Sequence, residues 1–157
     1  RVWGSHPCPG PPMRPLALST LVLSALLAPP PAHAAPPGCS LPGTLDGRRF
    51  TNLTDPYNRP DNPNAGHMVR VDFSANRYLL TVLGTRLRVQ GTYRYARLAP
   101  NIAVVDMEEA FEGGDTRYQL VLTCLTDHEG HFIYTQSDGP VPPQRRQNSG
   151  RWTLQPR

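Results

Sequence analysis

The chain has 157 residues, of which 38% are hydrophobic, and a formal net charge of +4. This length allows one domain with a core of its own. From Ala35 onward, 14 Arg stand against 12 acidic residues, a charge of +2, and the Arg are scattered along the chain. Because nucleic-acid binding requires a basic patch or stripe, we expect no nucleic-acid partner.

The first part of the chain has the three parts of a secretory signal. Met13-Arg14 is a short positive start, residues 16–27 are an apolar run too short to span a bilayer, and Ala32-His33-Ala34 is a small-x-small cleavage site. Residues 13–34 are therefore predicted to be a signal peptide, with a membrane anchor as the alternative. We expect a secreted or periplasmic protein that is free of the membrane after cleavage.

The mature domain keeps two cysteines. Residues 1–12, which contain Cys8, precede a plausible initiator Met, so we interpret them as a non-native or upstream extension. Residues 35–157 then form the single domain, with Cys39 and Cys124 as its cysteines. In an oxidising compartment one disulfide is the economical interpretation, and two unpaired thiols are the alternative.

Short strand-like runs follow one another through the mature domain, separated by turns rich in Gly, Asn, Asp and Pro. Residues 86–97 alternate apolar and polar side chains, which is the period of a strand with one buried face. Residues 55–66 hold three Pro and form a loop long enough to act as a lid. The predicted strands are residues 48–53, 67–73, 77–83, 86–97, 102–111, 116–126, 131–136 and 150–155.

These runs predict an all-β fold, an eight-stranded antiparallel up-and-down β-barrel. Closure removes the exposed edges of a sheet, and a barrel of eight strands is either filled by side chains or holds one small molecule. A β-sandwich of the same strands is the alternative. Short, even connections without a long crossover favour the barrel.

Glu109 is the most informative residue for function. By alternation it shares a face with Val105 and Met107, so it is expected to point into the barrel. A buried carboxylate is costly without partners and tends to have a raised pKa, and such a group can act as an acid, a base or a ligand anchor. The alternative is that Glu108 and Glu109 form a solvated corner at the end of the strand.

Four tyrosines are also on inward positions, namely Tyr93, Tyr95, Tyr118 and Tyr134. A Tyr offers an apolar body with one hydroxyl, which suits the lining of a pocket that orients a polar ligand. Ordinary aromatic packing in a core explains the same pattern.

Other polar groups carry weaker signals. His128 and His131 flank a hairpin turn but lack further metal ligands nearby in sequence. The oxygens of Asp55, Asn58, Asp61 and Asn64 lack the ordered spacing of a calcium loop. We therefore predict no metal and no cofactor. Residues 52–54, Asn-Leu-Thr, match the acceptor triplet for N-glycosylation.

The central stretch resembles the calycin-type small barrels related to phenolic acid decarboxylase and the MoaF-like proteins. The shared pattern consists of LDGRRF at 45–50, a Gly-x-aromatic strand from Gly91, NIAVVDMEE at 101–109, YQLVL at 118–122 and GHFIY at 130–134. The resemblance implies a barrel and a cavity. It places Glu109 at the family's catalytic carboxylate, Thr92 at its Arg, and Asn52 and Thr54 near its pair of Tyr, so one of the four catalytic positions is retained.

Three hypotheses follow for function. The first is an exported barrel that binds a small amphipathic molecule, with Glu109 and the inward tyrosines lining the pocket, and it is favoured because no complete catalytic set is visible. The second is an enzyme that uses Glu109 as acid or base on a small aromatic or carboxylic acid. The third is a protein-interaction module, an inhibitor or adhesin, that uses the 55–66 loop.

Overall fold

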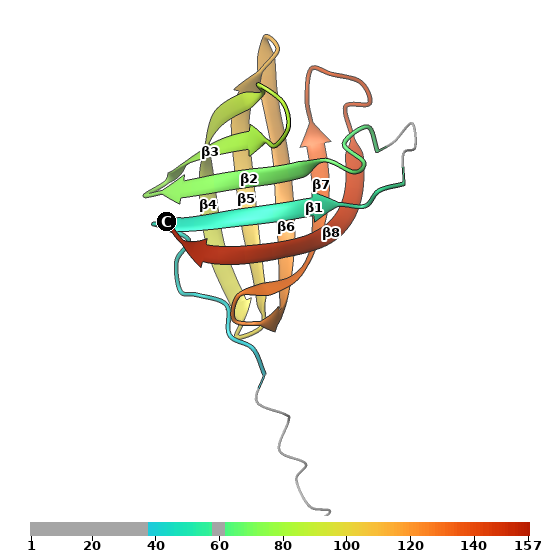
Figure 1. Cartoon of the computed structure of the whole chain (residues 1–157). Helices are drawn as coiled ribbons and strands as arrows, with labels where there is room; N and C mark the ends of the chain where they lie inside the picture. Colours follow the sequence, from blue (N-terminus) through green and yellow to red (C-terminus); the bar gives the residue numbers. More distant parts are fainter. Residues whose placement is uncertain (1–37, 58–61) are drawn as a thin grey trace, which may run out of the picture. The chain divides into compact units, whose positions relative to one another are not determined.

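The computed structural model describes residues 38–57 and 62–157. The predicted extension, the predicted signal peptide and part of the 55–66 loop lie outside these residues. Within the described residues, eight antiparallel strands close into a barrel in the order of the sequence, and the last strand pairs with the first (Figure 1). The strands are β1 (Arg48–Thr54), β2 (Met68–Ser74), β3 (Arg77–Val82), β4 (Arg88–Ala99), β5 (Ile102–Phe111), β6 (Gly114–Thr126), β7 (Glu129–Asp138) and β8 (Arg146–Pro156).

The closed barrel confirms the predicted all-β fold and excludes the sandwich, because β1 pairs along its length with both β2 and β8. Alternation within the strands decides which side chains face inward. The register sets Val105 opposite Leu120 and Tyr93 opposite Met107, and all four side chains are buried. In the described part of the chain, no helix has the length and apolar character that crossing a membrane requires.

The last two strands are longer than the alternation predicts. β7 begins at Glu129 and β8 at Arg146, where the sequence indicated a hairpin loop and a solvated Pro-rich connection. Pairing explains the extension, since Gln136 lies opposite Arg146 and Glu129 opposite Thr153. Backbone hydrogen bonds across a closed sheet thus include polar residues that no local pattern marks as strand.

One end of the barrel is closed by the segment before β1. Leu41 and Leu45 are fully buried there, and the backbone N–H of Leu41 donates to the carbonyl of Pro100 at 2.8 Å. The Cys39–Cys124 disulfide, with Cα atoms 5.9 Å apart, ties this segment to β6 and confirms the predicted pairing.

Large side chains pack behind that segment. Phe50 stacks on Trp152 with ring centroids 5.9 Å apart and meets the edge of Phe132 at 6.5 Å. The indole N–H of Trp152 donates to the carbonyl of His131 at 2.9 Å, so its polar atom is satisfied while the ring stays buried. This end of the barrel is therefore filled.

The opposite end carries the β1–β2, β3–β4, β5–β6 and β7–β8 connections. The 62–67 segment is tied to it by Thr54, whose hydroxyl lies 2.6 Å from the carbonyl of Asn64 and 3.0 Å from that of His67. Residues of these connections, among them His67, Thr85 and Val141, line the cavity, so the candidate site lies at this end of the barrel.

Candidate functional site

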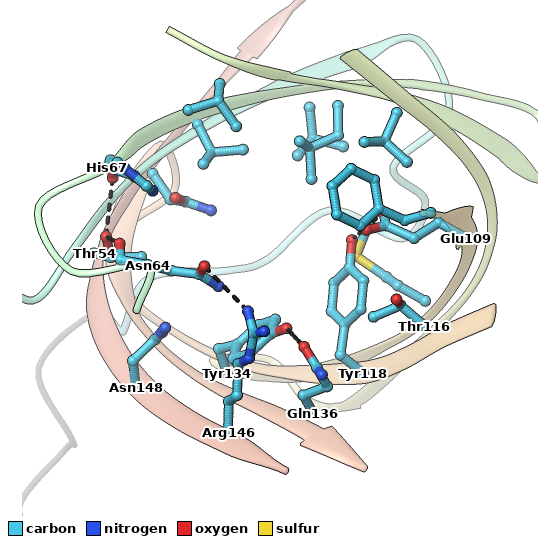
Figure 2. A pocket seen from close by; sticks show the side chains of 18 of the residues that line it. Thr54, Asn64, His67, Glu109, Thr116, Tyr118, Tyr134, Gln136, Arg146 and Asn148 are labelled. Atoms are coloured by element: carbon cyan, nitrogen blue, oxygen red, sulfur yellow. Dashed lines mark hydrogen bonds between the residues drawn. The ribbon is translucent and has the colours of Figure 1, made fainter. Parts of the chain in front are cut away.

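A cavity of about 320 Å³ occupies the open half of the barrel (Figure 2). Its apolar wall comes from β2, β3 and β4, whose inward side chains there are short and branched. The polar side chains that line the cavity come from β1 and from β5 to β8, where they alternate with apolar residues such as Met107, Leu120 and Phe132. The apolar wall consists of Val69, Val71, Leu80, Val82 and Val89. The cavity thus has one apolar face and one face whose polar groups can form hydrogen bonds.

Glu109 lies on the polar face and accepts hydrogen bonds from two phenols. The hydroxyl of Tyr78 donates to its Oε2 at 2.6 Å, and the hydroxyl of Tyr118 donates to the same oxygen at 3.1 Å. The two phenol oxygens are 3.0 Å apart. Glu109 therefore points into the barrel as predicted, and the solvated-corner alternative is wrong for this residue. Its neighbour Glu108 is on the outer face, where its Oε1 lies 3.2 Å from Nε of Arg117.

Gly91 makes room for the Tyr78 ring. Gly91 pairs with Tyr78 on β3 and with Glu109 on β5, so it stands at the back of the carboxylate cluster. A Cβ at this position would lie 2.6 Å from the Tyr78 hydroxyl and 2.4 Å from the carbonyl oxygen of Glu108. The absence of a side chain on Gly91 is thus what allows the ring to reach Glu109.

Burial and hydrogen bonding act on the Glu109 carboxyl in opposite directions. Loss of hydration raises its pKa, and the hydrogen bonds from Tyr78 and Tyr118 lower it, with burial the larger effect. The pKa of each phenol is also raised, first by burial and then by the nearby carboxylate. Both hydroxyls consequently stay protonated and remain donors to Glu109.

Tyr134 and Gln136 form a second polar group on β7. The Tyr134 hydroxyl donates to Oε1 of Gln136 at 2.6 Å, and Nε2 of Gln136 donates to the carbonyl of Gln144 at 2.8 Å. Burial raises the pKa of Tyr134. The ring of Tyr134 packs on that of Tyr118 with centroids 5.1 Å apart, so this group adjoins the Glu109 cluster.

Arg146 lies at the mouth of the cavity (Figure 2). Its guanidinium donates to the carbonyl oxygens of Val141, Pro142 and Pro143 and, from Nη1 at 3.4 Å, to Oδ1 of Asn64. Arg146 therefore joins the β7–β8 connection to the 62–67 segment. No ion pair links it to Glu109, although both residues line the same cavity within the described part of the chain.

Two buried asparagines also line the cavity. Asn52 on β1 is 8% exposed and Asn148 on β8 is 6% exposed, and the side-chain oxygen of each has no hydrogen-bond partner among the described residues. The amide nitrogen of Asn148 donates to Oδ1 of Asn62 at 3.2 Å. Burial of Asn52 and Thr54 also means that the acceptor triplet at 52–54 is not accessible for glycosylation in the folded barrel.

Tyr118, Tyr134 and Glu109 meet in the cavity, whereas Tyr93 and Tyr95 do not line it. Tyr93 packs against Phe73 with centroids 4.6 Å apart, and the hydroxyl of Tyr95 donates to the carbonyl of Pro42 at 2.7 Å. Both face inward as the alternation predicts, but they are nearer the closed end. Alternation identifies the inward face without giving a height along the barrel axis.

In the described residues, the candidate metal ligands do not come together into a metal site. His128 and His131 belong to no group of three or more candidate ligands there. In the 55–66 loop, Oδ1 of Asp55 accepts the backbone N–H of Tyr57 at 2.9 Å. Oδ1 of Asn64 accepts from Arg146. Asn58 and Asp61 lie outside the described residues.

Sequence reasoning missed Tyr78, Asn52, Asn148 and Arg146 as members of the site. Tyr78 had an available signal, because its strand alternates and Gly91 stands at a position where the next strand leaves space. For Asn52 the signal was the family resemblance, which placed it near a catalytic position. Asn148 and Arg146 had no signal, since a polar residue in a strand is ordinarily on the outer face.

The fold and site together define a small closed β-barrel with an internal cavity that contains a carboxylate. Comparison of the chain with protein-family models, with curated proteins and with solved structures found no significant match. At the positions that the resemblance implied, Asn52, Thr54 and Glu109 line the cavity. Thr92 is exposed on the outer face, so no residue stands in for the family's Arg at that position.

Proposed function

We propose that this protein is an exported, calycin-like barrel that binds a small amphipathic molecule in the cavity beside Glu109. The observation that carries the proposal is a cavity of about 320 Å³ with an apolar wall on one side and Glu109, Tyr118 and Tyr134 on the other. Ligand pockets of about 300–1,000 Å³ with a mainly apolar lining and a few polar groups are typical of small-molecule sites.

The different packing of the two halves of the barrel supports a ligand-binding role for the cavity. The closed half contains Phe50 and Trp152, neither of which lines the cavity, whereas the cavity wall on β2, β3 and β4 is built from valines and a leucine. A barrel selected for stability alone would fill both halves, because unfilled interior volume forfeits packing energy. A filled interior would favour the interaction module that uses the 55–66 loop, so the cavity supports the small-molecule hypotheses instead.

Export is supported by the cystine. Disulfides persist in oxidising compartments and are rare in the cytosol of mesophiles. The Cys39–Cys124 pair spans 85 residues of sequence and holds the segment that closes one end of the barrel. A signal peptide at 13–34 is the sequence feature that would deliver the chain to such a compartment.

A second candidate function is acid–base catalysis on a small aromatic or carboxylic acid through Glu109. The observation that favours it is the pair of phenol hydroxyls at 2.6 and 3.1 Å from Oε2. Two donors on one carboxylate orient its second oxygen, and a raised pKa brings a carboxyl closer to the pH at which it both takes and gives a proton.

The test of binding uses protein purified from its own host. Native mass spectrometry should detect a co-purifying small molecule that is lost on denaturation, and Val89→Phe should abolish it by filling the apolar wall. Ile133→Phe, which adds the same kind of bulk to an exposed position, is the matched control and should retain the molecule. The proposal would be contradicted if the native protein had the mass of the polypeptide alone, or if the Val89→Phe variant retained the molecule.

The enzyme candidate is separated from simple binding by the fate of the molecule. The molecule should be released, identified and incubated with the native protein. Recovery of the molecule unchanged supports binding alone. The enzyme is favoured if the molecule is converted to a product, if Glu109→Gln abolishes this conversion, and if Glu108→Gln does not. Glu108→Gln is the control, because it removes a carboxylate from the outer face of the same strand.

A further inference from the structure

Among the described residues, the Glu109 carboxylate has neutral partners and no cationic one. Both phenols donate to Oε2, and Oε1 accepts no hydrogen bond from the described residues. The ion pairs formed by the described residues are on the outer face, and Glu109 takes part in none of them. A buried charge is costly without an opposite charge, so the cavity contains an unmet requirement for a cation.

The orphan amide oxygens have the same requirement for a donor. Asn52 and Asn148 are each more than nine-tenths buried and line the cavity, and the unpartnered atom of each is the carbonyl oxygen. In Asn148 the hydrogen bond to Asn62 identifies which end of the amide is the nitrogen. A buried acceptor without a donor costs about 1–3 kcal/mol, which a bound N–H group would recover.

Arg146 does not meet these requirements. Four of the N–H groups that a guanidinium carries are already directed at the Val141, Pro142 and Pro143 carbonyls and at Asn64. Figure 2 shows the guanidinium beside Tyr134 and Gln136. The positive charge of Arg146 thus lies at the mouth of the cavity, whereas the negative charge of Glu109 lies on its wall. A ligand cation would be repelled at the mouth and attracted at Glu109, which orients it.

We propose that the ligand is a small primary amine with an apolar body, whose ammonium group pairs with Oε1 of Glu109. The apolar body lies on the wall formed by Val69, Leu80 and Val89. An ammonium group is a compact cation with three N–H donors, so it can serve the carboxylate and still donate to a further acceptor. This inference rests on the proposed function, because it names the chemical class of the molecule that the cavity binds.

The test compares three probes of equal chain length by isothermal titration calorimetry on the full chain at neutral pH. The probes are n-octylamine, octan-1-ol and octanoate. The amine should bind about tenfold more tightly than the alcohol, since a hydrogen bond to a charged group is the stronger kind. Glu109→Gln should remove the preference for the amine over the alcohol, and Glu108→Gln should keep it.

The outcomes separate this inference from the proposed function. Equal or tighter binding of the alcohol or of octanoate would overturn the amine inference while leaving a ligand-binding cavity in place, and so would a preference that survives Glu109→Gln. Failure of all three probes to bind would overturn both. Should Glu109→Gln not fold, the ranking of the three probes on the unaltered protein still decides the inference.

Discussion

The two ends of the barrel are built from the same strands but differ in their interiors, because one end is filled with apolar side chains and the other contains a cavity with polar groups. At the closed end, Leu41 and Leu45 cover a core in which Phe50 stacks on Trp152, and the indole N–H of Trp152 has a hydrogen-bond acceptor. At the open end, the interior holds a carboxylate and two asparagines with unpartnered oxygens. The first arrangement stabilises the fold, and the second leaves interactions that a ligand can complete.

The difference teaches where the stability of this protein resides. Buried apolar volume stabilises a fold, whereas buried polar groups without full partners reduce stability. A domain of this kind therefore depends on its closed end and on its cystine for the stability that the open end lacks. Changes at the closed end should have the largest effects on unfolding, and changes at the open end should act mainly on binding.

The largest effect is expected for the disulfide. Replacement of both Cys39 and Cys124 by Ala should lower the free energy of unfolding by about 4 kcal/mol, because the unfolded chain regains the entropy of a long closed loop. Urea unfolding without reductant measures this loss. Ligand binding at the open end should persist at a temperature where the variant is still folded.

Alkylation provides the control for that experiment. In the native protein both cysteines should resist iodoacetamide until a reductant is added, after which both should be labelled. Immediate labelling of the unreduced native protein would show that the cystine is not formed. In that case the stability difference would need another explanation.

A matched pair of leucines compares the two ends directly. Leu122 is fully buried near the closed end, so Leu122→Ala should cost about 2–5 kcal/mol of unfolding free energy. Leu80 is half-buried on the cavity wall, so Leu80→Ala should cost about 1 kcal/mol, because the removed atoms already border open space. Equal losses in urea unfolding would mean that the open half is packed like the closed half.

The smallest effect is expected for Glu109 and has the opposite sign. Burial raises the pKa of this carboxyl, so the folded protein holds its proton more tightly than the unfolded chain. Stability then falls as the pH rises from the ordinary value of 4.5 through the raised folded pKa. Glu109→Gln should therefore stabilise the protein at neutral pH, by about 0.5–2 kcal/mol, since it removes a buried charge.

The pH dependence identifies the cause. The titratable groups around Glu109 are Tyr78 and Tyr118, which donate to it, and Tyr134 and Arg146 on β7 and β8. The stabilisation should shrink as the pH falls toward 4.5, the ordinary pKa of the group, and should vanish well below it, where both states carry a protonated carboxyl. Glu108→Gln is the control and should show no such gain. A gain that persists in acid would assign the effect to packing.

Much of the barrel could be predicted, and for a physical reason. Strand alternation is a local property, so the inward direction of Tyr93, Tyr118 and Glu109 follows from the order of residues in each strand. The predicted mature domain contains only two cysteines, so each had one possible partner and the Cys39–Cys124 disulfide also followed. The sequence did not indicate which inward residues share one level of the barrel, which is why Tyr95 was grouped with Tyr134.

The order of residues by itself determined the closed antiparallel wall, the cystine and the inward direction of Glu109, because each depends on spacing along the chain. Tertiary structure alone decided that Tyr78 and Tyr118 meet the same carboxylate oxygen, that Asn52 and Asn148 face an interior, and that Arg146 joins two loops at the mouth. These contacts join residues far apart in sequence, and they depend on the stagger of strands around a closed barrel, which no local pattern encodes.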